Sequence, residues 1–224
     1  MKAQPRIAVF GGSFNPVHEA HLGIVRALIE DTAIQAVIVV PARRSPFKQD
    51  VPLLPNALRW NMLREALRGL QGVILSDIEL TRPAPSYTID TLRTLASQLP
   101  AARLELALGW DAFTEFAGWY RAAEMLSLAG LIVFDRAPPD PRVVTKHPPI
   151  GDWSKLLPPP WDAQTSVQDE RNLALADGRV LVRYLPSALP AVAARDILSR
   201  HSLEGVPTGA REVLADYWGR ANAG

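Results

Sequence analysis

The sequence predicts an α/β protein built on a doubly wound parallel sheet, and three observations carry this prediction. Short, unbroken apolar runs alternate with longer segments whose apolar residues recur at helical spacing, as is typical of strands covered by helices on both faces. Turns rich in glycine and proline separate many of these segments. A strand, a helix and a second strand at residues 7–40 form the first unit, in which the two strands are expected to be parallel with a right-handed connection.

The first unit begins with the run Ile7–Phe10, which stops at Gly11-Gly12 and predicts a buried strand that enters a tight glycine turn. Asn15-Pro16 marks a second turn, after which a helix is expected to begin near His18. Glycines let a ligand approach the backbone, and the free N–H groups at a helix start suit phosphate. Taken alone, this order fits either a phosphate site or a tight strand–helix junction.

Two of the four histidines of the chain lie in this turn and favour the phosphate site. His18 and His21 are three residues apart, so both side chains are expected on one face of the first helical turn. A hydroxyl, that of Ser13, lies close by in the sequence. Two imidazoles beside a hydroxyl and a helix start are typical of sites that handle phosphate.

The second strand of the unit, Ala36–Val40, is followed by a segment at 41–50 that we call the basic loop. It carries Arg43, Arg44 and Lys48, and open α/β sheets bind their ligands at the carboxyl ends of the strands. Because this loop leaves the sheet at the same edge as the glycine turn, we interpret its cations as neutralising phosphate. Simple solvation of three surface cations is the alternative.

The remaining elements follow the same alternation. An amphipathic helix is expected at 56–70, a short strand at 73–75, and a helix in the segment SYTIDTLRTLASQL with Ser86 as its N-cap. Further strands are expected at 104–108, 130–134 and 179–183, and further helices from about Ala112, at 122–128, at 191–200 and at 208–220. This order makes a Rossmann-like sheet with C-terminal helices the expected architecture.

The alternation lapses after the strand at 130–134. Residues 138–160 hold eight of the twenty prolines, which argues against a helix there. We therefore expect an irregular, proline-rich excursion over 138–178, within a single domain that covers residues 1–224.

Composition excludes several classes of protein. The 24 Lys and Arg residues nearly balance the 23 Asp and Glu residues, so no large basic field indicates a nucleic-acid partner. Cysteine is absent, which excludes disulfides, zinc–thiolate sites and a thiol nucleophile. No apolar run reaches the length of a membrane span, and the N-terminus lacks a secretory pattern. A cytoplasmic protein is expected, and the sequence leaves open whether it forms a homo-oligomer.

Four stretches together resemble one enzyme family. GGSFNPVHEAH is similar to the signature of the HxGH-type nucleotidyltransferase superfamily, with Ala20 where the family usually has glycine. PARRSPFK, SYTIDTL and GWDAFTEFAGWYRAAEML follow it in the order found in nicotinate-nucleotide adenylyltransferases. The last two stretches discriminate this family from pantetheine-phosphate adenylyltransferases and cytidylyltransferases, which share only the first motif. The resemblance covers residues 7–134 and returns at the C-terminus.

The resemblance implies adenylyl transfer from ATP to nicotinate mononucleotide, giving deamido-NAD and pyrophosphate. Magnesium would be bound through the ATP phosphates, without a metal site made by protein side chains. The residues that it places in catalysis are His18, His21 and Lys48. Those that it places around ATP are Gly11, Gly12, Ser13, Phe14, Arg44, Asp111 and Arg195, with Asp111 near the ribose.

For the mononucleotide, the resemblance implies a site made by Tyr87, Thr88, Gly109, Trp119, Tyr120 and Arg121. Trp119 is the expected stacking partner of the pyridine ring. Trp110 is a weaker candidate for that role, because aromatic packing between helices also explains it. Tyr87 and Thr88 open a helix, so their backbone N–H groups could receive the nicotinate carboxylate.

The chain departs from the family in its C-terminal I-S-S-T-x-I-R motif, which holds the triphosphate. The aligned residues here are Val192-Ala193-Ala194-Arg195-Asp196-Ile197-Leu198, so the serine hydroxyls and the final arginine are missing. Arg195 or Arg200 could supply the lost cation. Phe47 also stands where the family often has histidine. Two alternatives stay open: another acceptor, such as nicotinamide mononucleotide, and a nucleotide-binding protein that has lost turnover.

Overall fold

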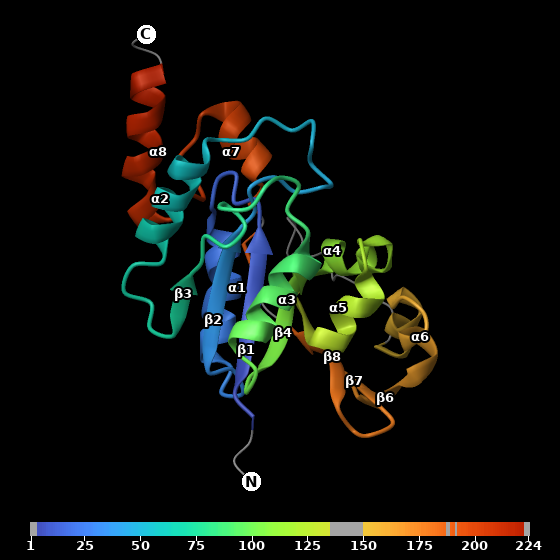
Figure 1. Cartoon of the computed structure of the whole chain (residues 1–224). Coiled ribbons are helices and arrows are strands. Elements are labelled where there is room, and N and C mark those ends of the chain that lie inside the picture. Colours follow the sequence, from blue (N-terminus) through green and yellow to red (C-terminus); the bar gives the residue numbers. More distant parts are fainter. Residues whose placement is uncertain (1–3, 135–149, 187–188, 191, 222–224) are drawn as a thin grey trace, which may run out of the picture.

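The computed structural model describes residues 4–134, 150–186, 189–190 and 192–221. Within them, eight strands form one sheet in the order β3-β2-β1-β4-β5-β8-β7-β6 (Figure 1). The strands are β1 Arg6–Gly12, β2 Ala36–Pro41, β3 Val73–Leu75, β4 Arg103–Gly109, β5 Ala129–Phe134, β6 Thr165–Asp169, β7 Asn172–Leu175 and β8 Val180–Leu185.

The first six strands of this order are parallel, so the predicted doubly wound sheet is confirmed. β1 lies between β2 and β4, with Val9 opposite both Ile38 and Leu106. The chain runs outward to β2 and β3 and then returns to place β4 on the other side of β1. This reversal is a topological switch point, where open α/β sheets bind ligands at the carboxyl ends of the strands.

Helices cover both faces of the sheet (Figure 1). They are α1 Glu19–Glu30, α2 Asn56–Ala66, α3 Thr88–Gln98, α4 Trp110–Thr114, α5 Ala122–Leu128, α6 Trp161–Gln164, α7 Ala194–Arg200 and α8 Thr208–Ala221, with 3₁₀ turns at Phe116–Gly118 and Ile150–Leu156. One core packs the sheet against α1, α2, α7 and α8, and the other packs it against α3 and α5. Successive residues of β1 alternate between the two cores, as Ala8 and Val9 do, which explains the unbroken apolar runs.

The element boundaries differ from the expected ones in a few places. α2 ends at Ala66 and not at residue 70. Leu67 is its C-cap residue, and Gly69 adopts a left-handed φ of +81°, which is incompatible with a continuing helix. The helix expected from about Ala112 begins at Trp110. α7 begins at Ala194; residue 191, where that helix was expected to start, lies outside the described residues.

The prediction of an irregular excursion over 138–178 is wrong for its second part. Residues 150–178 form the 3₁₀ turn, α6 and the antiparallel hairpin β6–β7, which extends the sheet beyond β8. Trp153, from the 3₁₀ turn, is only 2% exposed and packs in the core against Trp110 and Phe113 of α4. Apolar burial thus orders this segment despite its prolines. Residues 138–149 lie outside the described residues.

Candidate active site

The predicted glycine turn is the end of β1 itself. Gly11 and Gly12 pair in parallel register with β2, and the positive φ falls on Phe14, at +44°. A Cβ on Gly12 would lie 3.2 Å from the Phe14 ring, so glycine here allows Phe14 to fold back. The Phe14 side chain is 2% exposed and packs edge-on against His21, at 4.8 Å between centroids. Its ring therefore supports a predicted catalytic histidine from the core side.

His18 and His21 are brought together as predicted. His18 is the N-cap residue of α1, and the two rings stack with centroids 3.6 Å apart and planes 21° apart. His18 is buried and His21 is half-buried. The His18 backbone N–H donates to His21 Nδ1 at 3.2 Å. A neutral His21 therefore carries its proton on Nε2, which makes Nε2 a hydrogen-bond donor.

The start of α1 is less open than expected. The Glu19 N–H donates to the Gly205 carbonyl at 2.8 Å, and the His18 N–H is used by His21. The prediction of free N–H groups is wrong at these two positions. Gly205 of the C-terminal segment accepts from one N–H group, and the His21 side chain accepts from the other. The loop before α8 therefore lies directly beside the histidine pair.

The basic loop is tied to the start of α3 by Ser86. The Arg43 N–H donates to Ser86 Oγ at 3.0 Å, and the Ser86 N–H donates to the Arg44 carbonyl at 2.8 Å. Ser86 as the N-cap of α3 is therefore a wrong prediction; Tyr87 takes that place without a side-chain cap. Lys48 and Arg43 are exposed to solvent, whereas Arg44 donates within its own loop to the Gln49 carbonyl at 2.5 Å.

Arg59 is the residue that the sequence reasoning missed. It lies on α2 and is 0% exposed. Its guanidinium donates to the Ser13 carbonyl at 2.6 Å and to the Arg43 carbonyl at 3.3 Å, so it connects the end of β1 with the basic loop. The signal was present, because Met62 and Leu63 follow Arg59 at i+3 and i+4. That spacing puts Arg59 on the buried face of the helix.

The predicted mononucleotide residues gather between the start of α3 and the segment before α5. The rings of Tyr87 and Tyr120 lie 4.8 Å apart. Trp119 lies 5.5 Å from Phe47 of the basic loop, between ring centroids. Trp119 Nε1 is buried, and no group of the described residues accepts its hydrogen bond.

Four further predicted residues lie near this group or at the same sheet edge. Arg121 places its guanidinium 5.9 Å from the Tyr120 ring and pairs with Glu124 at 3.1 Å. Thr88 is the first residue of α3, and Gly109 is the last of β4. Asp111 lies in the first turn of α4 and is exposed.

Trp110 and Arg195 lie on two further helices, α4 and α7. The Trp110 ring packs at 4.8 Å from Trp153 and at 5.7 Å from Phe113, which favours packing over base stacking. Arg195 is exposed on α7, whose N-cap residue Ala193 has no side-chain cap. In Figure 1, α7 lies beyond the carboxyl ends of the central strands.

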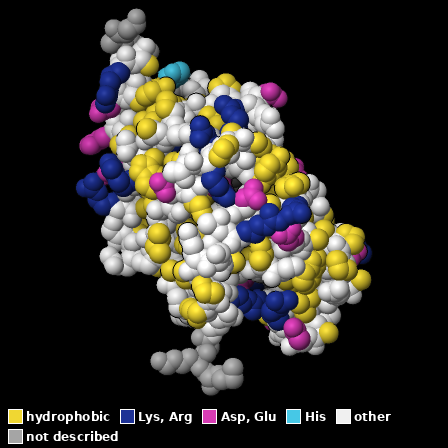
Figure 2. Space-filling model, viewed as in Figure 1, with side chains coloured by type: hydrophobic (Ala, Val, Ile, Leu, Met, Phe, Trp, Pro, Cys, Tyr) yellow, Lys and Arg dark blue, Asp and Glu magenta, His cyan; other side chains and the backbone are white. Residues whose placement is uncertain are grey.

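Charge and shape elsewhere on the surface are less distinctive. Basic and acidic side chains are interspersed over the face drawn in Figure 2, as the balanced composition led us to expect.

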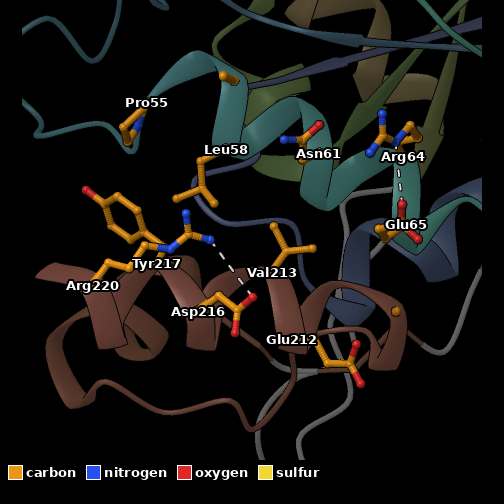
Figure 3. A pocket seen from close by; sticks show the side chains of 12 residues that line it. Pro55, Leu58, Asn61, Arg64, Glu65, Glu212, Val213, Asp216, Tyr217 and Arg220 are labelled. Carbon is orange, nitrogen blue, oxygen red and sulfur yellow. Dashed lines mark ion pairs between the residues drawn. The ribbon is translucent and has the colours of Figure 1, made fainter.

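A groove of about 550 Å³ lies between α2 and α8 (Figure 3), and none of the predicted site residues lines it. These two helices approach closely at Gly209, where a Cβ would come within 2.6 Å of the Glu65 carbonyl oxygen. No helix in the described ranges is long and apolar enough to cross a membrane.

The arrangement is that of an open α/β sheet with paired imidazoles at its switch point, and comparison with known proteins shows the family. The model of the cytidylyltransferase-like family matches residues 9–180. The chain therefore belongs to the cytidylyltransferase-like family. A probable nicotinate-nucleotide adenylyltransferase of Thermomicrobium roseum is 30% identical over 206 residues, which cover 91% of this chain and 95% of that protein. The expected resemblance to this group of enzymes is confirmed.

Other relatives match over a shorter stretch. A probable nicotinate-nucleotide adenylyltransferase of Gloeobacter violaceus is 42% identical over 134 residues, which cover 58% of this chain and 64% of that protein. The match thus spans less than two thirds of that relative's length. Among solved structures, Plasmodium falciparum nicotinic acid mononucleotide adenylyltransferase complexed with NaAD has a TM-score of 0.68 at 16% identity, covering 95% of this chain and 96% of that one. This likeness shows the shared fold.

Proposed function

We propose that this chain transfers the adenylyl group of ATP to nicotinate mononucleotide, releasing pyrophosphate and forming deamido-NAD. The observation that carries the proposal is the stacked pair of His18 and His21 beside the switch point of the sheet. The basic loop and the aromatic group around Trp119 lie at the same edge. The names of the relatives support nicotinate mononucleotide as the acceptor.

The chemistry requires no covalent protein intermediate. The phosphate of the mononucleotide attacks the α-phosphorus of ATP in line, and pyrophosphate leaves, so the protein positions the reactants and stabilises charge. His18 and His21 donate to phosphate oxygens; His21 does so from Nε2, because its Nδ1 is occupied by the His18 backbone. Lys48 and Arg44 neutralise the phosphates, and the strand end Gly11–Ser13 lies beneath them.

The mononucleotide is bound on the other side of the switch point. Trp119 stacks on the pyridine ring, and its buried Nε1 can donate to a ligand oxygen. The backbone N–H groups at Tyr87 and Thr88 receive the carboxylate at the start of α3, which favours the acid over the amide. Tyr120, Arg121 and Gly109 complete this site, whereas Asp111 accepts from the ribose of ATP.

The divalent metal is assigned to the substrate. The side chains nearest the proposed phosphate position are imidazoles and cations, a donor set that suits phosphate oxygens better than Mg²⁺. Mg²⁺ is therefore carried by the ATP phosphates, where it supplies further charge neutralisation.

The test is an assay of pyrophosphate release with ATP, Mg²⁺ and a panel of mononucleotides, followed by identification of the dinucleotide product. We expect product with nicotinate mononucleotide at a kcat/KM well above that with nicotinamide mononucleotide. A higher kcat/KM with another mononucleotide would show that this other compound is the acceptor. ATP binding in calorimetry without any product would instead indicate a nucleotide-binding protein that has lost turnover.

A further inference from the structure

Arg59 is a buried cation whose hydrogen bonds all go to uncharged acceptors. Its guanidinium donates to Ser13 and Arg43 as described above, to the Leu54 carbonyl at 3.2 Å and to Asn56 Oδ1 at 2.6 Å. In the ranges that the structure describes, no carboxylate lies within ion-pair distance of it. The side chain is therefore hydrogen-bonded but lacks a counter-ion.

Electrostatics make this arrangement costly in the ligand-free protein. Burial and, to a lesser extent, the charge of the nearby Arg44 together lower the pKa of Arg59 to about 10. The guanidinium remains protonated near neutral pH, so the fold holds a positive charge away from water beside a second cation. A buried charge without a partner is unfavourable, and here an incoming anion is what can compensate it.

Its position shows where that anion would be. Ser13 directly follows the Gly11-Gly12 strand end, and Arg43 belongs to the basic loop, so Arg59 lies behind the two backbone segments between which the proposed phosphates bind. Arg59 can therefore act on the phosphates through geometry and charge, without direct contact.

We propose that Arg59 is a positioning residue that fixes the basic loop against the end of β1 and supplies the buried positive charge that bound polyphosphate neutralises. This inference rests on the proposed function for the identity of the polyphosphate. A guanidinium is required because only its planar fork reaches acceptors on separate backbone segments at once, whereas a lysine supplies the charge from a single point.

The two roles separate in Arg59→Lys and Arg59→Met. The lysine variant keeps the charge and loses the bridge; the methionine variant loses both. The matched control is Arg64→Met, since Arg64 lies on the same helix with its side chain 61% exposed and forms an ion pair with the neighbouring Glu65. For each protein we would measure the affinity for pyrophosphate by thermal shift, and kcat and KM for both substrates.

We expect Arg59→Met to weaken pyrophosphate binding and raise the KM for ATP about 10- to 100-fold, because the buried positive charge that attracts the phosphates is lost. The KM for the mononucleotide should stay within about threefold of wild type, a split that a general loss of structure would not produce. Arg59→Lys should keep pyrophosphate binding within about threefold and lose about tenfold in kcat, because the loop is no longer fixed. Arg64→Met should behave as wild type.

Wild-type binding and turnover in Arg59→Lys and Arg59→Met would overturn the proposal while leaving the proposed function intact. A wild-type chain that neither pyrophosphate nor ATP stabilises would overturn the proposed function as well. If Arg59→Met does not fold, the lysine variant decides alone: an unchanged kcat contradicts the positioning role.

Discussion

The basic loop and helix α7 lie at the same edge of the sheet, but they are held in different ways. The basic loop is connected by side-chain hydrogen bonds to α2 through Arg59 and to the start of α3 through Ser86. α7 begins at an N-cap alanine with no side-chain cap, and its Arg195 is exposed. One region is cross-linked to the rest of the site, and the other rests on apolar packing around Ile197.

The difference between these two regions explains how the chain can lack the serine hydroxyls of the I-S-S-T-x-I-R motif, which aligns with residues 192–198. The imidazoles and cations that the proposed function places at the ATP phosphates come from the N-terminal half of the chain, where Arg59 and Ser86 hold the basic loop in place. The C-terminal segment contributes the Gly205 carbonyl that caps α1. We infer that phosphate recognition has shifted toward the N-terminal side of the site, and the following variants test this asymmetry.

The largest effect is expected from His18→Ala. Removing a positioned donor to the transferring phosphoryl group should lower kcat by about 10²–10³-fold, while the KM for the mononucleotide stays within about threefold. The control is His201→Ala, because His201 is exposed and packs at 5.1 Å from Trp218, between ring centroids. Steady-state kinetics decide, and unchanged turnover in His18→Ala would remove this residue from the chemistry.

A direct comparison of the two regions comes from Lys48→Ala and Arg195→Ala. Lys48 is expected to contact phosphate, so its loss should raise the KM for ATP about 10- to 100-fold. Arg195 is exposed on a helix without a side-chain cap, so solvent screens its charge and a change of about threefold is expected. A larger effect at Arg195 than at Lys48 would reverse the asymmetry.

Trp119→Ala tests the acceptor side of the site. Loss of base stacking should weaken mononucleotide binding about tenfold and leave the KM for ATP nearly unchanged. Trp110→Ala is the contrasting variant, because that ring packs against Trp153 and Phe113 and its loss should mainly reduce stability. Calorimetric titration with the mononucleotide separates the two; wild-type affinity in Trp119→Ala would leave stacking unsupported.

Ala193→Ser restores one lost hydroxyl at the weaker region. A serine at the N-cap of α7 should stabilise the helix by about 0.5–2 kcal/mol and lower the KM for ATP if the triphosphate reaches this end. Urea unfolding and steady-state kinetics measure the two effects separately. Stabilisation without any change in KM would place the nucleotide entirely on the N-terminal side.

The parallel core of the sheet was predictable because its strands are buried on both faces and read as unbroken apolar runs. The hairpin β6–β7 was not, since β6 is mostly exposed and Val167 is flanked on both sides by polar residues, a pattern that resembles a loop. Proline content alone misled the prediction there. The packing of Trp153 into the core depends on partners distant in sequence, which no local pattern shows.

In the site, the motif residues were predictable by type and spacing, but their supports were not. The pairing of His18 with His21 follows from helical geometry, whereas the Glu19–Gly205 bond joins segments that only the fold brings together. Arg59 was overlooked because a charged residue on an apolar helix face is usually expected to reach solvent. Ser86 was misassigned because the same hydroxyl suits an N-cap and a loop anchor equally well.

The smallest effect is expected from Glu79→Gln, which probes the support of the basic loop. Glu79 is 6% exposed and accepts from Thr91 at 2.6 Å; Arg82 donates to the same Thr91 hydroxyl, and the Arg82 carbonyl accepts from Arg43 Nη1 at 3.1 Å. Burial raises the pKa of Glu79, opposed by Thr91 and by the charge of Arg82, while Asp90 raises it further.

A raised carboxyl pKa means that Glu79 contributes stability that is fully present below its unfolded pKa and is lost as pH rises through the folded pKa. Glutamine keeps the acceptor but cannot ionise. The free energy of unfolding of the variant, relative to that of wild type, should therefore be highest at pH 7. It should fall by about 1 kcal/mol or less toward pH 4.5. Urea unfolding at both pH values measures this difference. An equal difference at the two pH values would show that Glu79 does not titrate with folding, and that the loop is supported by hydrogen bonds alone.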